Sequence, residues 1–195
     1  TYRAVRKSSK NTAWEAVSVS GTAYVPTTTI SAAPTGGGTS YEAVNLLTPK
    51  RINTFIGDGT ATQFKVDATD LDETAVTAEV NGSAITVSAV NRSTGMVTLA
   101  AAPANGNGLA NVSIAFAKTV SGHADKINKC RFAGLYGGKN DTRVFLSGNP
   151  EEPDCDWQSG LYDPTYFPDT GYTRMGTDAS AIVGYLKQYE SQVVV

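Results

Sequence analysis

The stretch NLLTPKRINTFIGDGTATQFKVD, residues 45–67, changes character near its middle. Its first part reads as the end of one segment, and its second part as the start of an independent β-module. In TQFKVD, Phe64 and Val66 fall on one face of an expected strand, and Gln63 falls on the other. The stretch therefore predicts a domain boundary near residue 50, with a β-domain after it.

The alternation of apolar and polar residues continues to residue 118. In AVTAEVNGSAITVSAV, Asn81-Gly82 stands between two alternating runs. This pair predicts a two-residue hairpin, because Asn and Gly both tolerate the positive φ angles of a type I′ turn. The last expected strand has one apolar face, formed by Val112, Ile114 and Phe116. Strands at this regular spacing predict a small antiparallel β-sandwich or barrel.

The N-terminal flank also reads as strands and turns. Residues 2–20 predict two strands around a polar turn at 7–11, and TAYVPTTTI predicts a third strand at 22–30. Residues 31–40 contain three consecutive glycines, so we expect a flexible connector there. The Lys-Ser/Thr of a phosphate-binding loop does not follow these glycines, and we therefore expect no cofactor at this point.

The C-terminal flank predicts two strands, over 127–135 and 142–147, joined by a tight turn. The segment PEEPDCDWQSGLYDPTYFPDTGYTRMGTDAS, residues 150–180, follows, and its prolines and length predict a loop without regular structure. Its aromatic residues are too numerous to stay in water, so packing should order it. A final strand is expected to include Val193–Val195.

Composition narrows the functional classes. Sixteen basic and eighteen acidic residues give a net charge of −2, and no basic block is present, so we expect no nucleic-acid partner. No apolar run is long enough to span a bilayer, so we expect no membrane partner. Charged residues make up 17% of the chain, below the roughly 25% of an ordinary soluble domain, which suits a surface partly covered by neighbours. Cys130 and Cys155 are expected to stay free thiols.

The chain resembles a known group of proteins in two places. Residues 55–119 resemble a module that recurs in bacteriophage tail, neck and fibre proteins. The match lies in Gly57-Asp58-Gly59, Phe64, Asn81-Gly82, Gly95-Met96-Val97, Ala102-Pro103 and the strand Val112 to Phe116. The residues from Asp125 onward are similar to a segment of phage virion proteins with β-propeller-like tail or neck parts. RVFLSGNP and DPTYFPD carry that match, together with YVPTTTI and GGGTSYEAVNLLTPKR.

The resemblance implies a mainly β fold in which a small antiparallel, Ig-like β-sandwich is inserted between β-propeller-like flanking strands. Residues 1–50 and 119–195 would form the propeller-like β body, and residues 51–118 the inserted β-sandwich. A closed propeller needs several four-stranded blades, and the flanks supply strands for one or two. We therefore expect either a fragment of a larger protein or a truncated sheet that pairs with itself or with neighbours.

The resemblance also implies a function. It indicates a structural protein of the phage virion, in the tail or neck, that is made in the host cytoplasm and acts by assembly with other virion proteins, as a homo-oligomer. Expected unpaired strand edges at Tyr2–Val5 and Val193–Val195 agree, because bare edges pair with other chains. The alternative is a module that binds a host-surface carbohydrate (glycan) or a receptor.

Groups that could carry catalysis are few, and we expect no enzyme activity. His123 is the single histidine, and neither a nucleophile nor a second metal ligand can be assigned to it. The best metal candidates are the acidic residues Glu151, Glu152, Asp154 and Asp156. They lack the order of a calcium loop, so we favour a solvated or partner-facing acidic loop and expect no metal. Carboxylates beside Trp157 would also suit a sugar platform or a glycosidase, but nothing in the sequence fixes their separation.

The run Asp163–Asp169 has two interpretations. In the first, prolines set a rigid loop while Tyr166 and Phe167 fill a gap at a sheet edge. In the second, the run is a contact between subunits, where aromatic residues are enriched. We favour the first, and the two can coexist. The residues proposed for an interface are Trp157, Tyr162, Tyr166 and Phe167.

Overall fold

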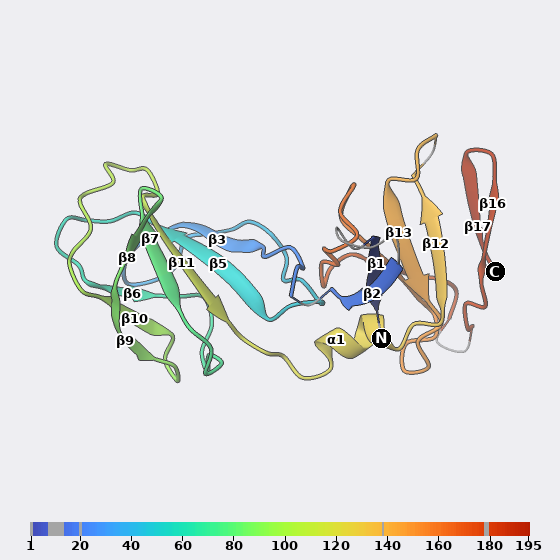
Figure 1. The fold of residues 1–195 in the computed structure, drawn as a ribbon, viewed down its shortest axis with the longest axis horizontal. Helices are drawn as coiled ribbons and strands as arrows, with labels where there is room; N and C mark the ends of the chain where they lie inside the picture. Colours follow the sequence, from blue (N-terminus) through green and yellow to red (C-terminus); the bar gives the residue numbers. More distant parts are fainter. Residues whose placement is uncertain (1, 8–13, 20, 138, 178–179) are drawn as a thin grey trace. The chain divides into compact units, whose positions relative to one another are not determined.

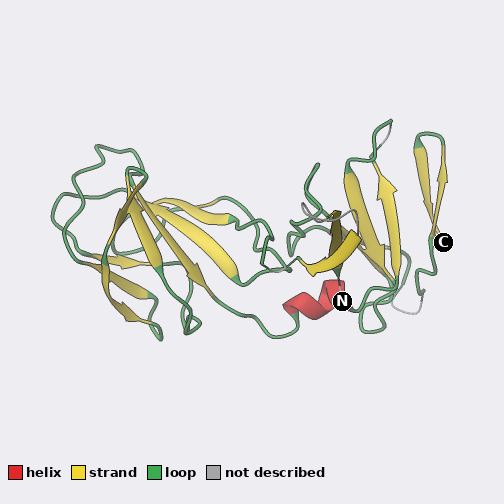
Figure 2. Cartoon of the chain, in the orientation of Figure 1, coloured by secondary structure: helices red, strands yellow, loops and turns green. Residues whose placement is uncertain are grey.

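The computed structural model describes the chain except for residues 1, 8–13, 20, 138 and 178–179. The described residues form a mainly β protein with several sheets and one short helix (Figures 1 and 2). They divide into two compact units, each built from separate stretches of the chain. Unit 1 consists of residues 1–24, 45–48 and 121–195, and unit 2 of residues 25–44 and 49–120.

Unit 2 contains two sheets that share one core. The larger sheet has six strands, in the order β4 (Thr39–Ser40), β3 (Thr27–Ala32), β5 (Lys50–Phe55), β11 (Val112–Ala117), β7 (Thr77–Val80) and β8 (Ser83–Ile85). The smaller sheet has three, in the order β6 (Gln63–Lys65), β10 (Met96–Leu99) and β9 (Val87–Asn91). All paired strands are antiparallel except β3 and β5, which are parallel.

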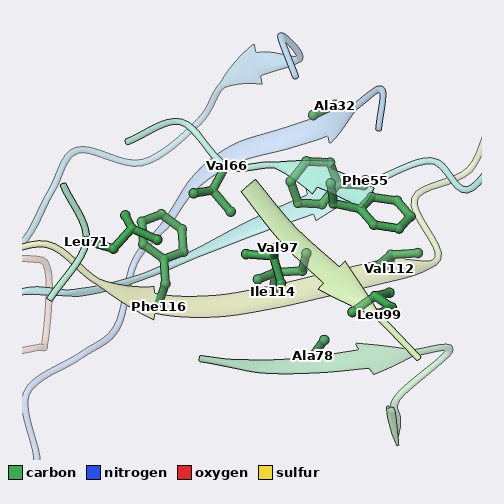
Figure 3. Close-up of a cluster of buried hydrophobic side chains, with 11 residues drawn as sticks. Ala32, Phe55, Val66, Leu71, Ala78, Val97, Leu99, Val112, Ile114 and Phe116 are labelled. Atoms are coloured by element: carbon green, nitrogen blue, oxygen red, sulfur yellow. The ribbon is translucent and has the colours of Figure 1, made fainter. Parts of the chain in front are cut away.

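Alternating side chains build the core of unit 2 (Figure 3). Val112, Ile114 and Phe116 on β11 are buried, as their spacing predicts. Phe64 on β6 meets Phe55 on β5 edge to face, with ring centroids 5.4 Å apart. Each sheet therefore contributes one face to the core, and burial of such side chains contributes about 1.5–3 kcal/mol each.

The hairpin at Asn81-Gly82 is confirmed. Val80 on β7 pairs with Ser83 on β8, which leaves a two-residue loop. Asn81 has φ 50° and Gly82 has φ 75°, as a type I′ turn requires.

The third predicted strand of the N-terminal flank belongs to unit 2. β3 pairs with β5, and Ile52 N–H donates to the Pro26 carbonyl at 2.9 Å. The expected boundary near residue 50 therefore differs from the compact units, because residues 25–44 lie with the β-domain and not with the flanks. The β-branched residues of β3 indicate a strand, but they do not reveal that its partner is a parallel strand across a long connection.

The expectation of a flexible connector at residues 31–40 is wrong. Gly36 N–H donates to the Ala33 carbonyl at 2.9 Å, and Lys65 N–H on β6 donates to the Pro34 carbonyl at 2.9 Å. Thr39 and Ser40 form β4, which pairs with β3. Backbone hydrogen bonds thus fix this segment within unit 2 instead of leaving it to join two bodies.

Unit 1 is built around an antiparallel sheet of four strands. Their order is β12 (Phe132–Tyr136), β13 (Arg143–Ser147), β14 (Cys155–Gln158) and β15 (Tyr172–Arg174). Two separate hairpins complete the unit: β1 (Arg3–Lys7) with β2 (Trp14–Ser18), and β16 (Tyr185–Gln188) with β17 (Ser191–Val194). The strands predicted around the N-terminal turn are present, and most of that turn lies outside the described residues.

Two local predictions for unit 1 are corrected. Residues 123–128 form the helix α1 (His123–Asn128), so the strand expected from residue 127 begins only at Phe132. The segment 150–180 contains β14 and β15 and is therefore not free of regular structure. The Cys-Asp-Trp-Gln sequence of β14 does alternate, but four residues in a proline-rich segment are too short a pattern to predict a strand. Cys155, Asp156 and Trp157 are all buried, so both faces of the strand are covered. Across the described parts of both units, no barrel or propeller closes.

Candidate interaction surface

The four acidic residues proposed as metal candidates do not converge. Each carboxylate has its own partner: three pair with a basic side chain, and the fourth, Asp156, accepts a hydrogen bond from an uncharged hydroxyl. The pairs are Glu151 with Lys129 at 2.6 Å, Glu152 with Lys126 at 3.7 Å, Asp154 with Arg174 at 2.7 Å, and Asp156 with the Tyr185 hydroxyl at 2.5 Å. Over the described part of the chain, no three Cys, His, Asp or Glu side chains are grouped to hold a metal ion.

The prediction of a solvated acidic loop fails for two of these residues. Asp154 and Asp156 are 2% and 4% exposed. They lie on or next to β14, a strand covered on both faces, where the pairing with Arg174 and Tyr185 compensates for the loss of water. Burial raises the pKa of the Asp156 carboxyl, and the hydrogen bond from Tyr185 opposes that rise.

Trp157, proposed for an interface or a sugar platform, lies in the core of unit 1. It is 1% exposed and packs with the buried cluster that includes Leu146 and Phe167. The Tyr172 ring lies 4.9 Å from its ring, centroid to centroid, and Lys126 Nζ lies 5.1 Å from the ring centroid. A sugar cannot stack on an indole that these neighbours cover.

The loop Asp163–Asp169 is anchored in unit 1 by the short stretch that includes Asn45. The Asn45 side chain donates to the Thr165 carbonyl at 2.8 Å and accepts from Phe167 N–H at 3.0 Å. Leu46 N–H donates to the Phe167 carbonyl at 2.8 Å. Phe167 is fully buried and meets the Tyr2 ring edge to face at 5.5 Å. This geometry is the one expected if Phe167 fills a gap beside the sheet.

The remaining two proposed interface residues lie nearer the surface. Tyr166 is half-buried against Tyr24, with ring centroids 5.1 Å apart. Tyr162 is 71% exposed. The proposed set therefore splits, because Trp157 and Phe167 belong to the core and Tyr162 and Tyr166 are open to contact.

A second exposed apolar group lies on the β16–β17 hairpin, where the terminal valines had predicted a bare edge. Leu186 pairs with Val193 across the hairpin, so the two side chains share a face. They are 63% and 47% exposed, and Val195, two residues further on that face, is 50% exposed. Tyr189 at the turn is 91% exposed. We call these four residues the hairpin face.

The other face of the hairpin is held to unit 1 by polar contacts. Tyr185 donates its hydroxyl hydrogen bond to Asp156, and Lys187 forms an ion pair with Asp141. Tyr136 on β12 donates to the carbonyl of Glu190. These contacts leave the hairpin face directed away from the sheet.

The outer edge of β17 carries unpaired backbone groups. Gly184 N–H donates to the Val195 carbonyl at 3.3 Å, and Val195 N–H donates to the Gly184 carbonyl at 3.0 Å. This pair determines which residues of β17 direct their backbone groups toward β16 and which direct them outward. The inward-bonded residues of β17 are then Ser191, Val193 and Val195, so the N–H and C=O groups of Gln192 and Val194 point outward. In the described chain, no strand pairs with this edge.

Both cysteines and the histidine lie in unit 1. Cys130 and Cys155 are free thiols, as expected. Burial raises the pKa of Cys130 to about 12 and that of Cys155 to about 11, so both stay protonated at neutral pH. His123 lies in the first turn of α1.

Comparisons with known proteins give no relative. No protein-family model matches the chain, and neither the curated proteins nor the solved structures give a significant match. The described part of the chain has no helix of the length and apolarity that crossing a bilayer requires.

Proposed function

We propose that this chain is a structural component of a bacteriophage virion, in the tail or neck, and that it acts by assembling with other virion proteins and with copies of itself. The observation that carries the proposal is the β16–β17 hairpin. It combines an open strand edge with an exposed apolar face, and β17 bears no charged residue. Natural proteins usually protect such edges with charges or bulges unless the edge pairs with another chain.

The arrangement of unit 1 supports a propeller-like role in the assembly. β12 to β15 form an antiparallel sheet in which the strand order follows the chain order, and this is the arrangement of one propeller blade. One blade cannot close a ring, so further blades would be needed to complete a propeller. The two sheets of unit 2, packed on a common core, support the Ig-like β-sandwich that we propose for that unit.

The assembly proposal is tested with a substitution that blocks the β17 edge. Val194→Pro removes one outward N–H group and leaves the inward bonds of its neighbours in place. Val194→Ala is the matched control, because it changes the same side chain and keeps the N–H. Light scattering across a dilution series should show an oligomer for the wild type and for Val194→Ala, and a monomer for Val194→Pro.

A wild-type chain that is monomeric at every concentration would contradict self-assembly. An oligomer that persists in Val194→Pro would show that the contact lies elsewhere. Circular dichroism of both variants checks that the sheets are retained.

The alternative, a module that binds a host-surface carbohydrate or a receptor, loses one support, because the buried Trp157 side chain cannot serve as a sugar platform.

A further inference from the structure

Unit 2 contains an open cavity of about 830 Å³ beside β6. Its walls come from the loop after β3, the connection between β5 and β6, and the loop that carries Asn105. The volume lies within the range of about 300–1,000 Å³ that is usual for small-molecule sites. The cavity is separate from the hairpin face, which belongs to unit 1.

One carboxylate is held in place at this cavity. Asp58 Oδ1 accepts hydrogen bonds from Thr60 N–H at 2.8 Å, from the Thr60 hydroxyl at 3.0 Å and from Ala61 N–H at 2.7 Å. These donors, Ala61 N–H first, hold the pKa of the carboxyl below its usual value. All three bonds use Oδ1, so Oδ2 is left to accept from a ligand. The Asp-x-Thr order in the sequence is the signal that could have indicated this turn.

The edge of β6 supplies main-chain groups to the same cavity. Leu99 N–H donates to the Thr62 carbonyl and Val66 N–H donates to the Gly95 carbonyl, so the ladder with β10 uses residues 62, 64 and 66. Gln63 therefore directs its N–H and C=O away from β10, toward the side where Pro34 accepts from Lys65. Gln63 and Pro34 both line the cavity.

The remaining lining is uncharged. It combines polar side chains of Thr35, Thr62 and Asn105 with apolar surfaces of Pro34, Ile56 and Ala61. Among the described residues that form the wall, Asp58 is the single charged one. A ligand with an anionic group would be repelled, while hydroxyl groups can donate to Oδ2 and both donate to and accept from Gln63.

We propose that this cavity binds a neutral, hydroxyl-rich ligand the size of one or two sugar rings. Hydroxyl groups on one edge of the ring bond to Asp58 Oδ2 and to the main chain of Gln63. The C–H face of the ring packs on Pro34 and Ile56. This binding is independent of the assembly through β17.

The test is a titration of the isotope-labelled full chain, with amide chemical shifts as the readout. The probes are the methyl glycosides of glucose, galactose, mannose and N-acetylglucosamine, with the glycoside of glucuronate as the anionic counterpart. At least one neutral probe should give saturable shifts at the amides of Ala61, Thr62 and Gln63. Glucuronate should bind more weakly than the matching neutral sugar, glucose.

Asp58→Asn and Asp70→Asn form a matched pair of variants. Asn at residue 58 keeps an Oδ1 acceptor for the turn but replaces Oδ2 with a donor, so affinity should fall about tenfold or more, as for loss of a charge-assisted hydrogen bond. Asp70 is an exposed carboxylate of the same unit outside the cavity, at a φ of 51° that Asn tolerates. Asp70→Asn should leave the affinity unchanged.

Three results would overturn the proposal: no saturable shift at these amides with any of the four neutral glycosides, equal binding of glucuronate, or unchanged affinity in Asp58→Asn. None of them depends on the oligomer mass, so the assembly proposal stands or falls separately.

Discussion

Phe167→Ala should destabilise unit 1 and leave unit 2 folded. The side chain is 0% exposed and packs edge to face on Tyr2 in the core that also contains Trp157. Truncating a buried phenylalanine costs about 3–5 kcal/mol, through lost burial and the cavity left behind. In a unit of about 100 residues, such a loss lowers the melting temperature by more than about 10 °C.

Tryptophan fluorescence isolates the response of unit 1. Both tryptophans of the chain, Trp14 and Trp157, belong to that unit, while far-UV circular dichroism reports on both units. The fluorescence-detected melting temperature should therefore fall, and the part of the dichroism transition that comes from unit 2 should keep its midpoint. Tyr162→Ala is the control, because the side chain is 71% exposed and its loss should change stability by at most about 0.5 kcal/mol. A change below about 1 kcal/mol in Phe167→Ala would refute the assignment of this loop to the core.

Two further substitutions test the backbone and the buried charge. Gly95→Ala and Gly82→Ala place the same side chain at two glycines with nearly equal φ angles, 74° and 75°. A Cβ added at Gly95 would lie 2.0 Å from the Ala68 carbonyl oxygen, whereas no atom lies within 4 Å of a Cβ added at Gly82. In thermal unfolding of unit 2, Gly82→Ala should cost about 1–2 kcal/mol and Gly95→Ala clearly more, and equal losses would contradict the contact. Asp156 has a carboxyl pKa raised by burial above 3.8, so its contribution to stability is present below that pH and is lost as the pH rises through the folded-state pKa. The free energy of unfolding, followed by tryptophan fluorescence, should therefore fall less from acidic to neutral pH in Asp156→Asn than in the wild type. Parallel pH profiles of the two proteins would contradict the raised pKa of Asp156.

Local signals in the sequence predicted the parts of the fold that depend on neighbouring residues. The hairpin at Asn81-Gly82 follows from two residues and their φ preferences, and the buried face of β11 follows from alternation. The parallel pairing of β3 with β5 could not be predicted, because side-chain period reveals which face is buried and not which strand is adjacent.

The candidate surface was predicted in part, for a related reason. Aromatic residues in a proline-rich segment suit an interface and a core equally, and only the neighbours decide between them. Tyr2 and Asn45, more than 100 residues away from Phe167, bury that side chain and its backbone. Val193–Val195 was a more reliable signal for a strand, because β-branched residues favour strands, but the open edge of that strand is seen only from its neighbours in the structure.

The division of the chain between the units has a consequence for biosynthesis. Unit 2 has all its residues once residue 120 has left the ribosome, whereas unit 1 still lacks residues 121–195. Leu46 and Leu47 are buried in the unit 1 core by later residues such as Leu146 and Trp157. At translation rates of about 5–20 residues per second, synthesis of residues 121–195 takes roughly 4 to 15 s after unit 2 is finished. A nascent chain with a finished unit 2 thus exposes two core leucines for seconds, which makes this interval the one in which chaperone binding or misassembly competes with folding.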